Sequence, residues 1–186
     1  MKRAFDLVLA LAALACLALP LALVALAVRL TSPGPVLYWS DRVGRDNRIF
    51  RMPKFRSMRI DTPVVATHLL TDPAQWLTPI GGFLRRSSLD ELPQLWNILR
   101  GDMSFVGPRP ALFNQNDLVQ LRTDLGVHRL LPGLTGWAQV NGRDESPIPQ
   151  KASLDAWYLQ HRSFWLDLRI LALTAWKVVR RENVSH

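Results

Sequence analysis

The chain has 186 residues, a length that fits one domain with an attached segment. Its formal net charge of +8 suits polyanionic partners such as nucleic acid, lipid head groups or diphosphate substrates, and its 48% of hydrophobic residues is sufficient for a sizeable core. Cys16 is the single cysteine, which excludes an intrachain disulfide and a cysteine-based zinc site.

The N-terminal segment contains an unbroken apolar run, residues 7–28, which as a helix would be roughly 33 Å long and could cross a bilayer. Three interpretations compete for this run. A secretory signal is supported by Lys2, Arg3 and the small-residue triplet 25–27. A straight transmembrane span is the default for a run of this length. The third interpretation is a re-entrant hairpin that enters one leaflet and returns.

Two features favour the re-entrant hairpin. Pro20 interrupts the run and removes a backbone hydrogen bond, which predicts a kink. Positive charge also flanks the run on both sides, with Lys2 and Arg3 before it and Arg29 after it. Because positive residues prefer the cytoplasmic side of a membrane, we expect both ends of the run to lie there.

The remainder of the chain indicates a helix-rich α+β domain with small β elements. Turn-forming residues at 31–35 separate this domain from the apolar run. A helix near the C-terminus has the pattern of an amphipathic membrane-surface helix or of a core helix with a basic solvent face. The expected elements are strands 36–39 and 48–58, a loop at 61–79, helix 92–99, a rigid turn at 104–110, helix 116–131, strand 136–140 and helices from 153 to the end, 164–181 being the amphipathic one.

Several common motifs are missing from the sequence. There is no G-x-x-x-x-G-K-[ST], no G-x-G-x-x-G and no H-E-x-x-H motif. There is also no D-x-D pair of the kind with which many nucleotide-sugar glycosyltransferases hold a metal, which argues against an ordinary glycosyltransferase. A nucleic-acid-binding domain is suggested by the basic pI alone, and the sequence has neither a clear basic helix nor a recognised binding motif to support it.

The stretch 85–97 carries two adjacent carboxylates, Asp90 and Glu91, at the expected start of a helix. Pro93 is tolerated only in a first helical turn, so the helix must begin close to Asp90, and Ser88 with Glu91 fits a capping box. The two carboxylates are then either ordinary capping acids or a reactive site. In the second case Asp90 can attack phosphorus and Glu91 can support Mg²⁺.

Two turns rich in glycine or proline follow. Arg109 stands between Pro108 and Pro110, which stiffen its backbone and allow its guanidinium to be aimed at a phosphate, although a plain surface turn is the alternative. Residues 132–143 end in Arg143 and could approach a phosphate or sugar closely, or form a tight hairpin without a ligand.

Four segments together resemble the bacterial sugar transferase family, the monotopic polyprenyl-phosphate phosphoglycosyltransferases. The similarity runs through nearly the whole chain in the family's order, and the chain resembles the short members that consist of the catalytic core. The resemblance implies a re-entrant anchor at residues 1–30 and a catalytic domain at 31–186 on the cytoplasmic face of the inner membrane. The segments that carry it are 54–58, 88–94, 101–110 and 132–143.

The resemblance also implies a reaction. A sugar-1-phosphate would pass from a UDP-sugar to undecaprenyl phosphate with release of UMP, as the first membrane step of surface polysaccharide or glycoconjugate synthesis. Asp90 would be the nucleophile that forms a covalent phosphosugar–aspartate intermediate, and Glu91 with Asp90 would hold Mg²⁺. The residues that would contact substrate or complete the site are Lys54, Pro108, Arg109, Pro110, Arg143 and Asp167.

The resemblance leaves some features open. The family's anchor breaks at a Ser-Pro pair, whereas Leu19 precedes Pro20 here, so the serine hydroxyl that could bond the freed carbonyl is missing. Residues 67–73 and 111–115 resemble members that act on N-acetylated amino sugars. The implied partners are the UDP-sugar, polyprenyl phosphate, the bilayer and downstream glycosyltransferases. A membrane-anchored scaffold with an inactive site is the alternative, against which the intact Asp90 and Glu91 argue.

Overall fold

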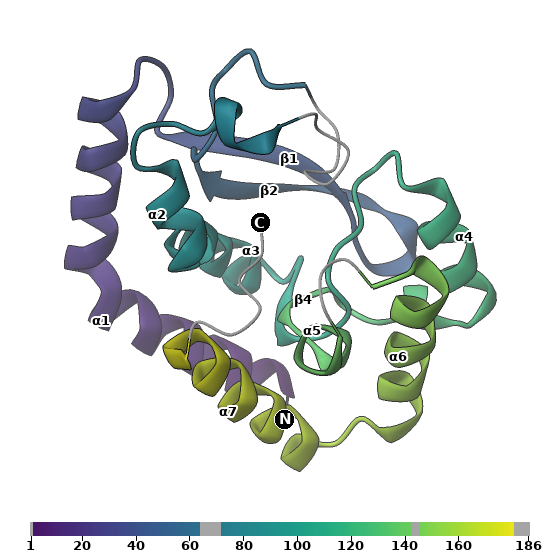
Figure 1. Ribbon diagram of the computed structural model, residues 1–186. Helices are drawn as coiled ribbons and strands as arrows, with labels where there is room; N and C mark the ends of the chain where they lie inside the picture. The colour runs from purple at the N-terminus through teal and green to yellow at the C-terminus, as the bar shows by residue number, and fades with distance from the viewer. Residues whose placement is uncertain (1, 64–71, 143–145, 181–186) are drawn as a thin grey trace.

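The computed structural model describes residues 2–63, 72–142 and 146–180, and it shows a helix-rich α+β fold (Figure 1). Within these residues the strands form two separate two-stranded sheets. This confirms the α+β class that the sequence predicts. The elements are α1 (Lys2–Thr31), β1 (Leu37–Val43), η1 (Arg45–Asn47), β2 (Ile49–Phe55), η3 (Pro73–Trp76), α2 (Gly81–Arg86), η4 (Leu89–Gln94), α3 (Leu95–Arg100), β3 (Ser104–Val106), α4 (Asn116–Asp124), η5 (Val127–Arg129), β4 (Gly133–Thr135), α5 (Trp137–Asn141), α6 (Ile148–His161) and α7 (Phe164–Arg180), where η marks a 3₁₀ helix.

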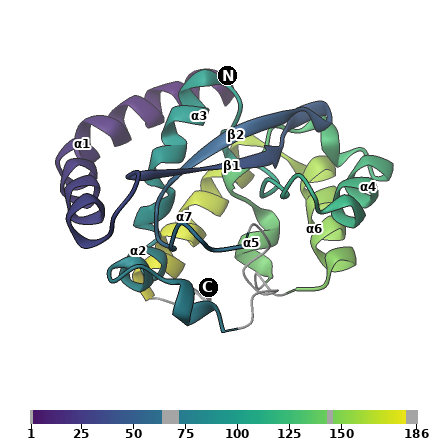
Figure 2. The same ribbon diagram turned by 90° about the horizontal axis from the view of Figure 1, so that it is seen from above.

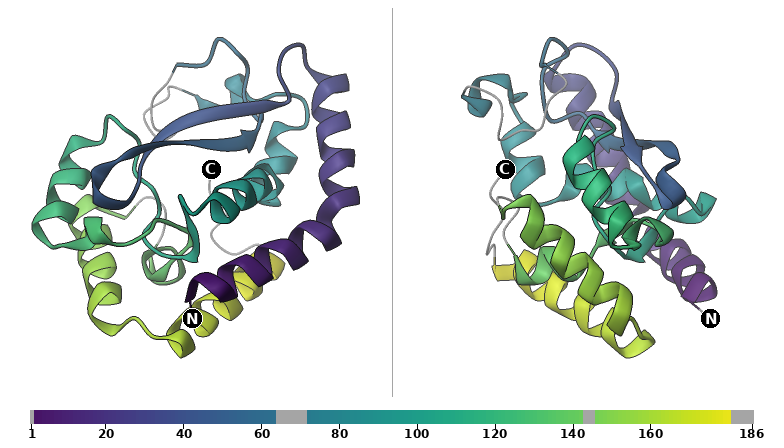
Figure 3. Two further views of the ribbon diagram at one scale, coloured as in Figure 1. Left: turned by 180° about the vertical axis from the view of Figure 1, so that it is seen from behind. Right: turned by 90° about the vertical axis from the view of Figure 1, so that its right-hand side faces the viewer.

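Helix α1 is long, apolar and bent. Its mean hydropathy reaches 2.8, so by length and composition it could cross a membrane, a test that a signal sequence also meets. Pro20 lies inside the helix, where it removes one backbone hydrogen bond and crowds the preceding turn. Figure 1 and the left view of Figure 3 show α1 bending near its middle and wrapping around one side of the molecule. The bend that Pro20 predicts is therefore present.

Both arms of α1 pack onto the rest of the chain. In the N-terminal arm, Ala10 is buried in one hydrophobic cluster with Ile98 of α3 and Ile170 of α7. In the C-terminal arm, Val28 is buried in a second cluster with Leu84 of α2. The helix also exposes large apolar residues on its remaining surface. Its exposed large residues are Val8, Leu11, Leu19, Leu23, Leu26 and Leu30.

Strands β1 and β2 form an antiparallel hairpin that lies against η4 and confirms the two strands predicted first in the chain. In its register Tyr38 is opposite Lys54, and Arg42 is opposite Phe50. Residues that face each other across two strands point to the same side of the sheet, and side chains alternate along each strand. Arg42 and Lys54 therefore lie on the same face of the hairpin.

The second sheet corrects two predictions. Strand β3 pairs in parallel with β4, with Ser104 opposite Gly133, so the segment predicted as a rigid turn at 104–110 begins with a strand. The strand predicted at 136–140 is wrong, because that segment belongs mostly to helix α5 and the strand ends at Thr135. A Cβ at Gly133 would lie 2.1 Å from the Gly107 nitrogen, so the close approach of these segments requires glycine. The paired residues Ser104 and Gly133 are 29 positions apart in the sequence, so local periodicity cannot predict their pairing.

The helices predicted in the second half of the chain are present with different bounds. The helix predicted at 116–131 is divided between α4 and η5, and α6 starts at Ile148 instead of residue 153. Pro149 lies in the first turn of α6, where proline costs no helical hydrogen bond. Figure 2 shows α4 and α6 on the side of the molecule opposite α1, with the β1–β2 hairpin extending between them.

Candidate active site

The adjacent carboxylates Asp90 and Glu91 lie on η4, which begins at Leu89, as the position of Pro93 predicts. The predicted capping box is wrong. Ser88 has φ 56° and ψ 16°, in the left-handed region, and its side chain makes no capping hydrogen bond. A capping serine normally has extended backbone angles that direct its hydroxyl to the first helical amides. The carboxylate of Glu91 is therefore available for other partners.

Glu91 is held between two basic side chains. The Lys54 Nζ donates a hydrogen bond of 2.7 Å to Glu91 Oε1, and the Arg109 Nη2 donates one of 2.8 Å to the same oxygen. Burial of the Glu91 carboxyl opposes its ionisation, but Arg109 and Lys54 outweigh burial and hold the pKa of Glu91 well below its usual range. Burial also lowers the pKa of Lys54, against the attraction of Glu91. Residues 37 and 18 positions away from Glu91 in sequence thus meet at one carboxylate.

Asp90 is in a different environment from its neighbour. It is 4% exposed, and its Oδ1 has no hydrogen-bond partner among the described residues. Burial raises the pKa of Asp90 to about 6; Lys54 acts in the opposite direction, whereas the charge of Glu91 adds to the rise. An unpaired buried carboxylate oxygen is costly and is often retained for chemistry. Asp90 and Glu91 are therefore adjacent in sequence but differ in the direction of their pKa shifts and in their hydrogen bonding.

Arg42 belongs to the same site, and the sequence analysis did not assign it a role there. Burial and, to a smaller extent, the neighbouring Arg109 lower the pKa of Arg42 to about 10, against the opposing effect of Glu91. The Arg42 guanidinium also donates to the Pro110 carbonyl. Alternation along 36–43 could have placed Arg42 on the inward face, but only the register with β2 brings it beside Lys54.

The turn that carries Arg109 is fixed by backbone hydrogen bonds. The Gly133 amide donates to the Pro108 carbonyl at 2.9 Å, and the Arg42 Nη1 donates to the Pro110 carbonyl at 3.2 Å. Pro108 and Pro110 themselves are buried. The stiff backbone predicted for Arg109 therefore has bonded carbonyls on both sides, and its side chain reaches Glu91.

The predicted site residue Asp167 is bonded to residues other than the two carboxylates. Asp167 is buried and accepts hydrogen bonds from Tyr158 Oη at 2.6 Å and from Lys2 Nζ at 2.5 Å. No hydrogen bond or ion pair among the described residues joins Asp167 to Asp90 or Glu91, and its bond to Lys2 links α7 to the N-terminal turn of α1. Arg143 lies outside the described residues.

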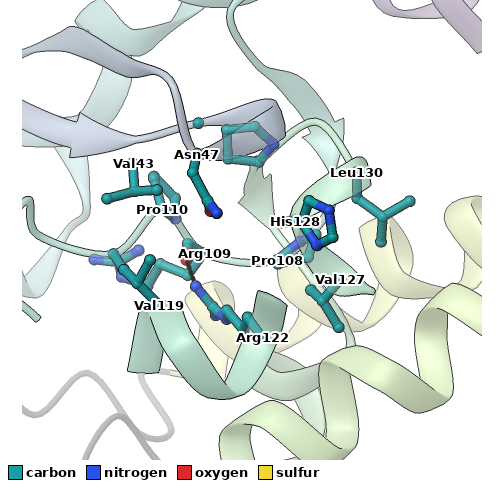
Figure 4. Close-up of a pocket in the computed structure, with 13 residues that line it drawn as sticks. Val43, Asn47, Pro108, Arg109, Pro110, Val119, Arg122, Val127, His128 and Leu130 are labelled. Carbon is teal, nitrogen blue, oxygen red and sulfur yellow. Dashed lines mark hydrogen bonds between the residues drawn. The ribbon is translucent and has the colours of Figure 1, made fainter. Parts of the chain in front are cut away.

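A small cavity lies behind the Pro108–Pro110 turn (Figure 4). Its volume is about 30 Å³, and its lining includes Arg109, Arg122 and His128 but neither Asp90 nor Glu91. A cavity of this volume has room for roughly two water molecules, which is far too small for a nucleotide sugar. We therefore do not assign this cavity to the nucleotide sugar.

The residues present fit one kind of magnesium site. The described residues contain no group of three or more acidic, cysteine or histidine side chains placed to hold a metal. Mg²⁺, however, is commonly held by one or two carboxylates, with water and substrate phosphates completing its shell. Asp90 and Glu91 supply two adjacent carboxylates, and Asp90 Oδ1 has no partner among the described residues. A magnesium ion that arrives with a diphosphate would match this donor set.

Comparisons with known proteins cover the chain almost completely. The model of the family described as bacterial sugar transferase matches residues 1–181. An uncharacterized sugar transferase of Bacillus subtilis (strain 168) is 41% identical over 187 residues, which are 100% of this chain and 90% of the relative. A UDP-glucose:undecaprenyl-phosphate glucose-1-phosphate transferase of Escherichia coli (strain K12) is 41% identical over 186 residues, with 95% of this chain and 40% of the relative covered.

A third relative carries a different sugar in its name. The UDP-N-acetylgalactosamine-undecaprenyl-phosphate N-acetylgalactosaminephosphotransferase of Aeromonas hydrophila is 35% identical over 178 residues, covering 93% of this chain and 42% of the relative. The chain thus spans less than half the length of this relative and of the Escherichia coli enzyme, but most of the Bacillus protein. Since the family model matches from the apolar helix to the end of α7, the chain belongs to the bacterial sugar transferase family, a family of undecaprenyl-phosphate sugar phosphotransferases.

Proposed function

We propose that this chain transfers a sugar-1-phosphate from a UDP-sugar to undecaprenyl phosphate and releases UMP, as the first membrane step in making a surface polysaccharide or glycoconjugate. Family membership and the names of the relatives support the reaction class. The observation that carries the proposal for this chain is the meeting of Lys54 and Arg109 at Glu91, directly beside the buried Asp90. Cations and a reactive carboxylate are the two elements that phosphoryl transfer from a diphosphate requires.

In the proposed first step, an oxygen of the ionised Asp90 attacks the phosphorus that bears the sugar. The bond from that phosphorus to the bridging oxygen of the diphosphate breaks, and the bridging oxygen leaves with UMP. In the second step, an oxygen of undecaprenyl phosphate attacks the same phosphorus, and the bond to Asp90 breaks. The products are undecaprenyl diphosphate sugar and the free Asp90 carboxylate, so the enzyme is ready for the next donor.

The basic side chains stabilise the charge of the diphosphate. Arg42, Lys54 and Arg109 bring three positive charges to a site with two carboxylates, which leaves an excess of positive charge for the substrate. Arg109 can bind phosphate through two parallel N–H groups, whereas Lys54 acts as a point charge. Glu91 holds both cations in place before substrate arrives. Charge that is already oriented costs little reorganisation when UMP leaves.

The resemblance implies Mg²⁺, which Glu91 and Asp90 would hold. A bound Mg²⁺ would neutralise charge on the diphosphate and so favour departure of UMP. The work assigned to the protein itself is then divided between the two carboxylates. Asp90 supplies the attacking oxygen, and Glu91 orients the Lys54 ammonium and the Arg109 guanidinium.

For the membrane segment we propose a re-entrant anchor with the catalytic domain on the cytoplasmic face of the inner membrane. Both ends of α1 are attached to the same domain. At the start, the Arg3 guanidinium donates to the Ile98 and Leu99 carbonyls; at the end, the Arg56 guanidinium donates to the Ser32 and Pro33 carbonyls. A straight 30-residue helix would separate its ends by about 45 Å, which does not suit two attachments to one face of a small domain.

Helix α7 supports the same placement. It buries Ile170 completely while Phe164, Trp165 and Trp176 are exposed, Trp165 by 77%. The Arg180 guanidinium lies over the Trp176 ring at 4.1 Å from its centroid. Exposed tryptophan with arginine is the side-chain combination that binds at the boundary between head groups and acyl chains. Figure 1 shows α7 beside the N-terminal arm of α1, so both would meet the same membrane surface.

For the sugar we propose an N-acetylated amino sugar. The likeness of residues 67–73 and 111–115 to such members supports it, although residues 67–71 lie outside the described residues. Relatives at similar identity are named for glucose and for N-acetylgalactosamine, so overall identity does not select one donor.

The proposed function is tested by measuring UMP release by the full chain in detergent micelles that contain undecaprenyl phosphate and Mg²⁺, over a panel of UDP-sugars. Release should be fastest with UDP-N-acetylated amino sugars and should require the lipid phosphate for more than one turnover. No release with any UDP-sugar would refute the proposed activity. Faster release with UDP-glucose or UDP-galactose would keep the activity and correct the sugar.

A further inference from the structure

Arg122 of α4 connects Arg109 to a buried acidic residue of α6. Its Nε and Nη2 donate to Asp155 Oδ2 at 2.9 and 2.6 Å, and its Nη1 donates to the Arg109 carbonyl at 2.8 Å. Figure 4 shows Arg122 pointing at the Arg109 backbone from the side of the small cavity. The Asp155 side chain is 2% exposed and that of Arg122 is 11% exposed, so this chain of contacts is shielded from solvent.

The geometry of the guanidinium makes this contact directional. Its N–H groups lie in one plane at fixed angles, so two hydrogen bonds to Asp155 determine where the remaining N–H points. The Arg109 carbonyl lies between the bonded carbonyls of Pro108 and Pro110. Three consecutive carbonyls in a segment whose φ angles proline restricts are thus each held by a donor. Rotation of the Arg109 peptide would break the contact with Arg122.

Stability alone is a weak explanation for this pair. A buried ion pair loses about as much in desolvation as it gains in attraction, and apolar residues of similar volume often serve stability equally well. Apolar side chains pack beside the pair, since Leu118 and Ala152 belong to the same α4–α6 contact. The presence of Arg122 is explained better by its hydrogen bond to the Arg109 carbonyl, because this bond holds the backbone that directs the Arg109 side chain to the phosphate site.

We propose that Arg122 and Asp155 are positioning residues that act on the nucleotide sugar through Arg109. This inference rests on the proposed function, because it takes Arg109 to contact the diphosphate. Neither residue touches substrate. Their effect is to keep the Arg109 guanidinium within bonding geometry of the phosphate, where displacement by about 1 Å can reduce turnover by roughly 100-fold.

A double-mutant cycle tests the inference in the full chain. Arg122→Lys retains the charge that pairs with Asp155, but the ammonium lacks the rigid, planar set of N–H groups with which the guanidinium fixes Asp155 and the Arg109 carbonyl relative to each other. We expect Arg122→Lys to lower kcat/KM for the UDP-sugar by about tenfold, mainly through KM. In an Arg109→Ala background the same change should have less than roughly a twofold effect, because the group it positions is gone. Asp155→Asn should show the same dependence on Arg109.

The control is Leu118→Ala, which opens the α4–α6 contact without removing a bond to Arg109. It should lower the unfolding temperature at least as much as Arg122→Lys, while kcat/KM stays within about twofold of the original chain. Independent, multiplicative effects of Arg122→Lys and Arg109→Ala would refute the inference, as would an equal kinetic loss in Leu118→Ala. The equilibrium dissociation constant for UDP is also measured for every variant of the cycle. Absence of UMP release by the unaltered chain would then refute the proposed function, and the UDP cycle would still decide the role of Arg122.

Discussion

The Lys54 ammonium and the Glu91 carboxylate are 2.7 Å apart, although one lies near the end of strand β2 and the other on η4. This ion pair joins the hairpin to the helix that carries Asp90. Arg109 forms a second ion pair with the same Glu91 carboxylate. Asp90, next to Glu91, is left with a carboxylate oxygen that has no partner in the described part of the chain. The first prediction concerns that oxygen.

Asp90→Asn should abolish both the covalent adduct and turnover. With UDP-sugar and Mg²⁺ but without undecaprenyl phosphate, the unaltered chain should release UMP only up to the enzyme concentration and gain the mass of one phosphosugar. The asparagine variant is nearly isosteric and should show neither, whereas Glu91→Gln should slow adduct formation without moving it to another residue. Steady turnover by Asp90→Asn would rule out the covalent mechanism.

The same substitution should stabilise the chain. Because the pKa of Asp90 is raised in the folded state to about 6, the folded chain binds more protons than the unfolded chain between pH ~4 and ~6 and loses stability as pH rises through that window. At pH 7 the ionised carboxylate therefore costs on the order of 3 kcal/mol, a cost that asparagine does not have. Asp90→Asn should raise the unfolding temperature at pH 7 by roughly 6 to 12 °C and should not raise it at pH 4. A lower unfolding temperature at pH 7 would contradict this.

The rate of adduct formation should depend on pH through Asp90. Attack requires the ionised carboxylate, so the rate in the absence of acceptor should be level above pH ~7 and fall as pH decreases through about 6. The half-reaction is the proper measurement, because the phosphate monoester of the lipid acceptor itself titrates near pH ~6. A rate that is unchanged between pH 7 and pH 5 would show that Asp90 is ionised over that whole range.

Arg109→Lys should impair turnover although it conserves charge. The guanidinium offers two parallel N–H groups to a phosphate, and an ammonium cannot reproduce that geometry. We expect kcat/KM to fall roughly 10- to 100-fold, with Arg59→Lys as the control because Arg59 pairs with Asp61 on the exposed surface. Near-normal kinetics in Arg109→Lys would reduce its role to that of a general positive charge.

Arg42→Gln tests the residue that the sequence analysis did not assign. If Arg42 contributes to the positive charge around the diphosphate, the KM for the UDP-sugar should rise about tenfold, and the effect should weaken at high salt. Arg51→Gln is the matched control. Arg51 lies on the other face of the same hairpin, over the ring of Trp39, and its replacement should leave KM unchanged. Equal effects of the two changes would assign them to the hairpin's stability.

The anchor predicts a labelling pattern. In a Cys16→Ala background, neither Ala4→Cys nor Asp41→Cys, both at exposed positions, should react with a membrane-impermeant thiol reagent added from the periplasm. Disruption of the cells should make both reactive. Labelling of one site in intact cells would establish a straight span. Pro20→Leu should shift part of the population towards that span, because leucine restores the backbone hydrogen bond that proline removes and so no longer favours the bend.

The parts of the fold that local chemistry determines could be predicted from the sequence. Pro20 predicts the bend in α1, and Pro93 predicts where the helix beside Asp90 begins. The capping box failed because the backbone of Ser88 is left-handed, which its sequence does not reveal. The strand at β4 was misplaced because its partner β3 is distant in the chain.

The site shows the same division. Separate sequence motifs contain Asp90 with Glu91 and, further along, Arg109, so each can be recognised by itself. Only the structure shows that Glu91 and Arg109 are in contact. Arg42 enters through strand register, a long-range property. Asp167 was expected to complete the site on resemblance alone, and here its carboxylate bonds Lys2 and Tyr158. No pattern within one segment contains that information.

The packing of α1 has a consequence for how this protein can be handled. Ala10 belongs to the cluster that contains Ile98 and Ile170, and Val28 belongs to the cluster that contains Phe55 and Leu84. The proposed anchor and the rest of the described chain therefore share their hydrophobic clusters. Removal of α1 would expose both clusters to water, so a truncated version without detergent is expected to aggregate. The helix proposed as the anchor is thus also a structural part of the fold that it would attach to the membrane.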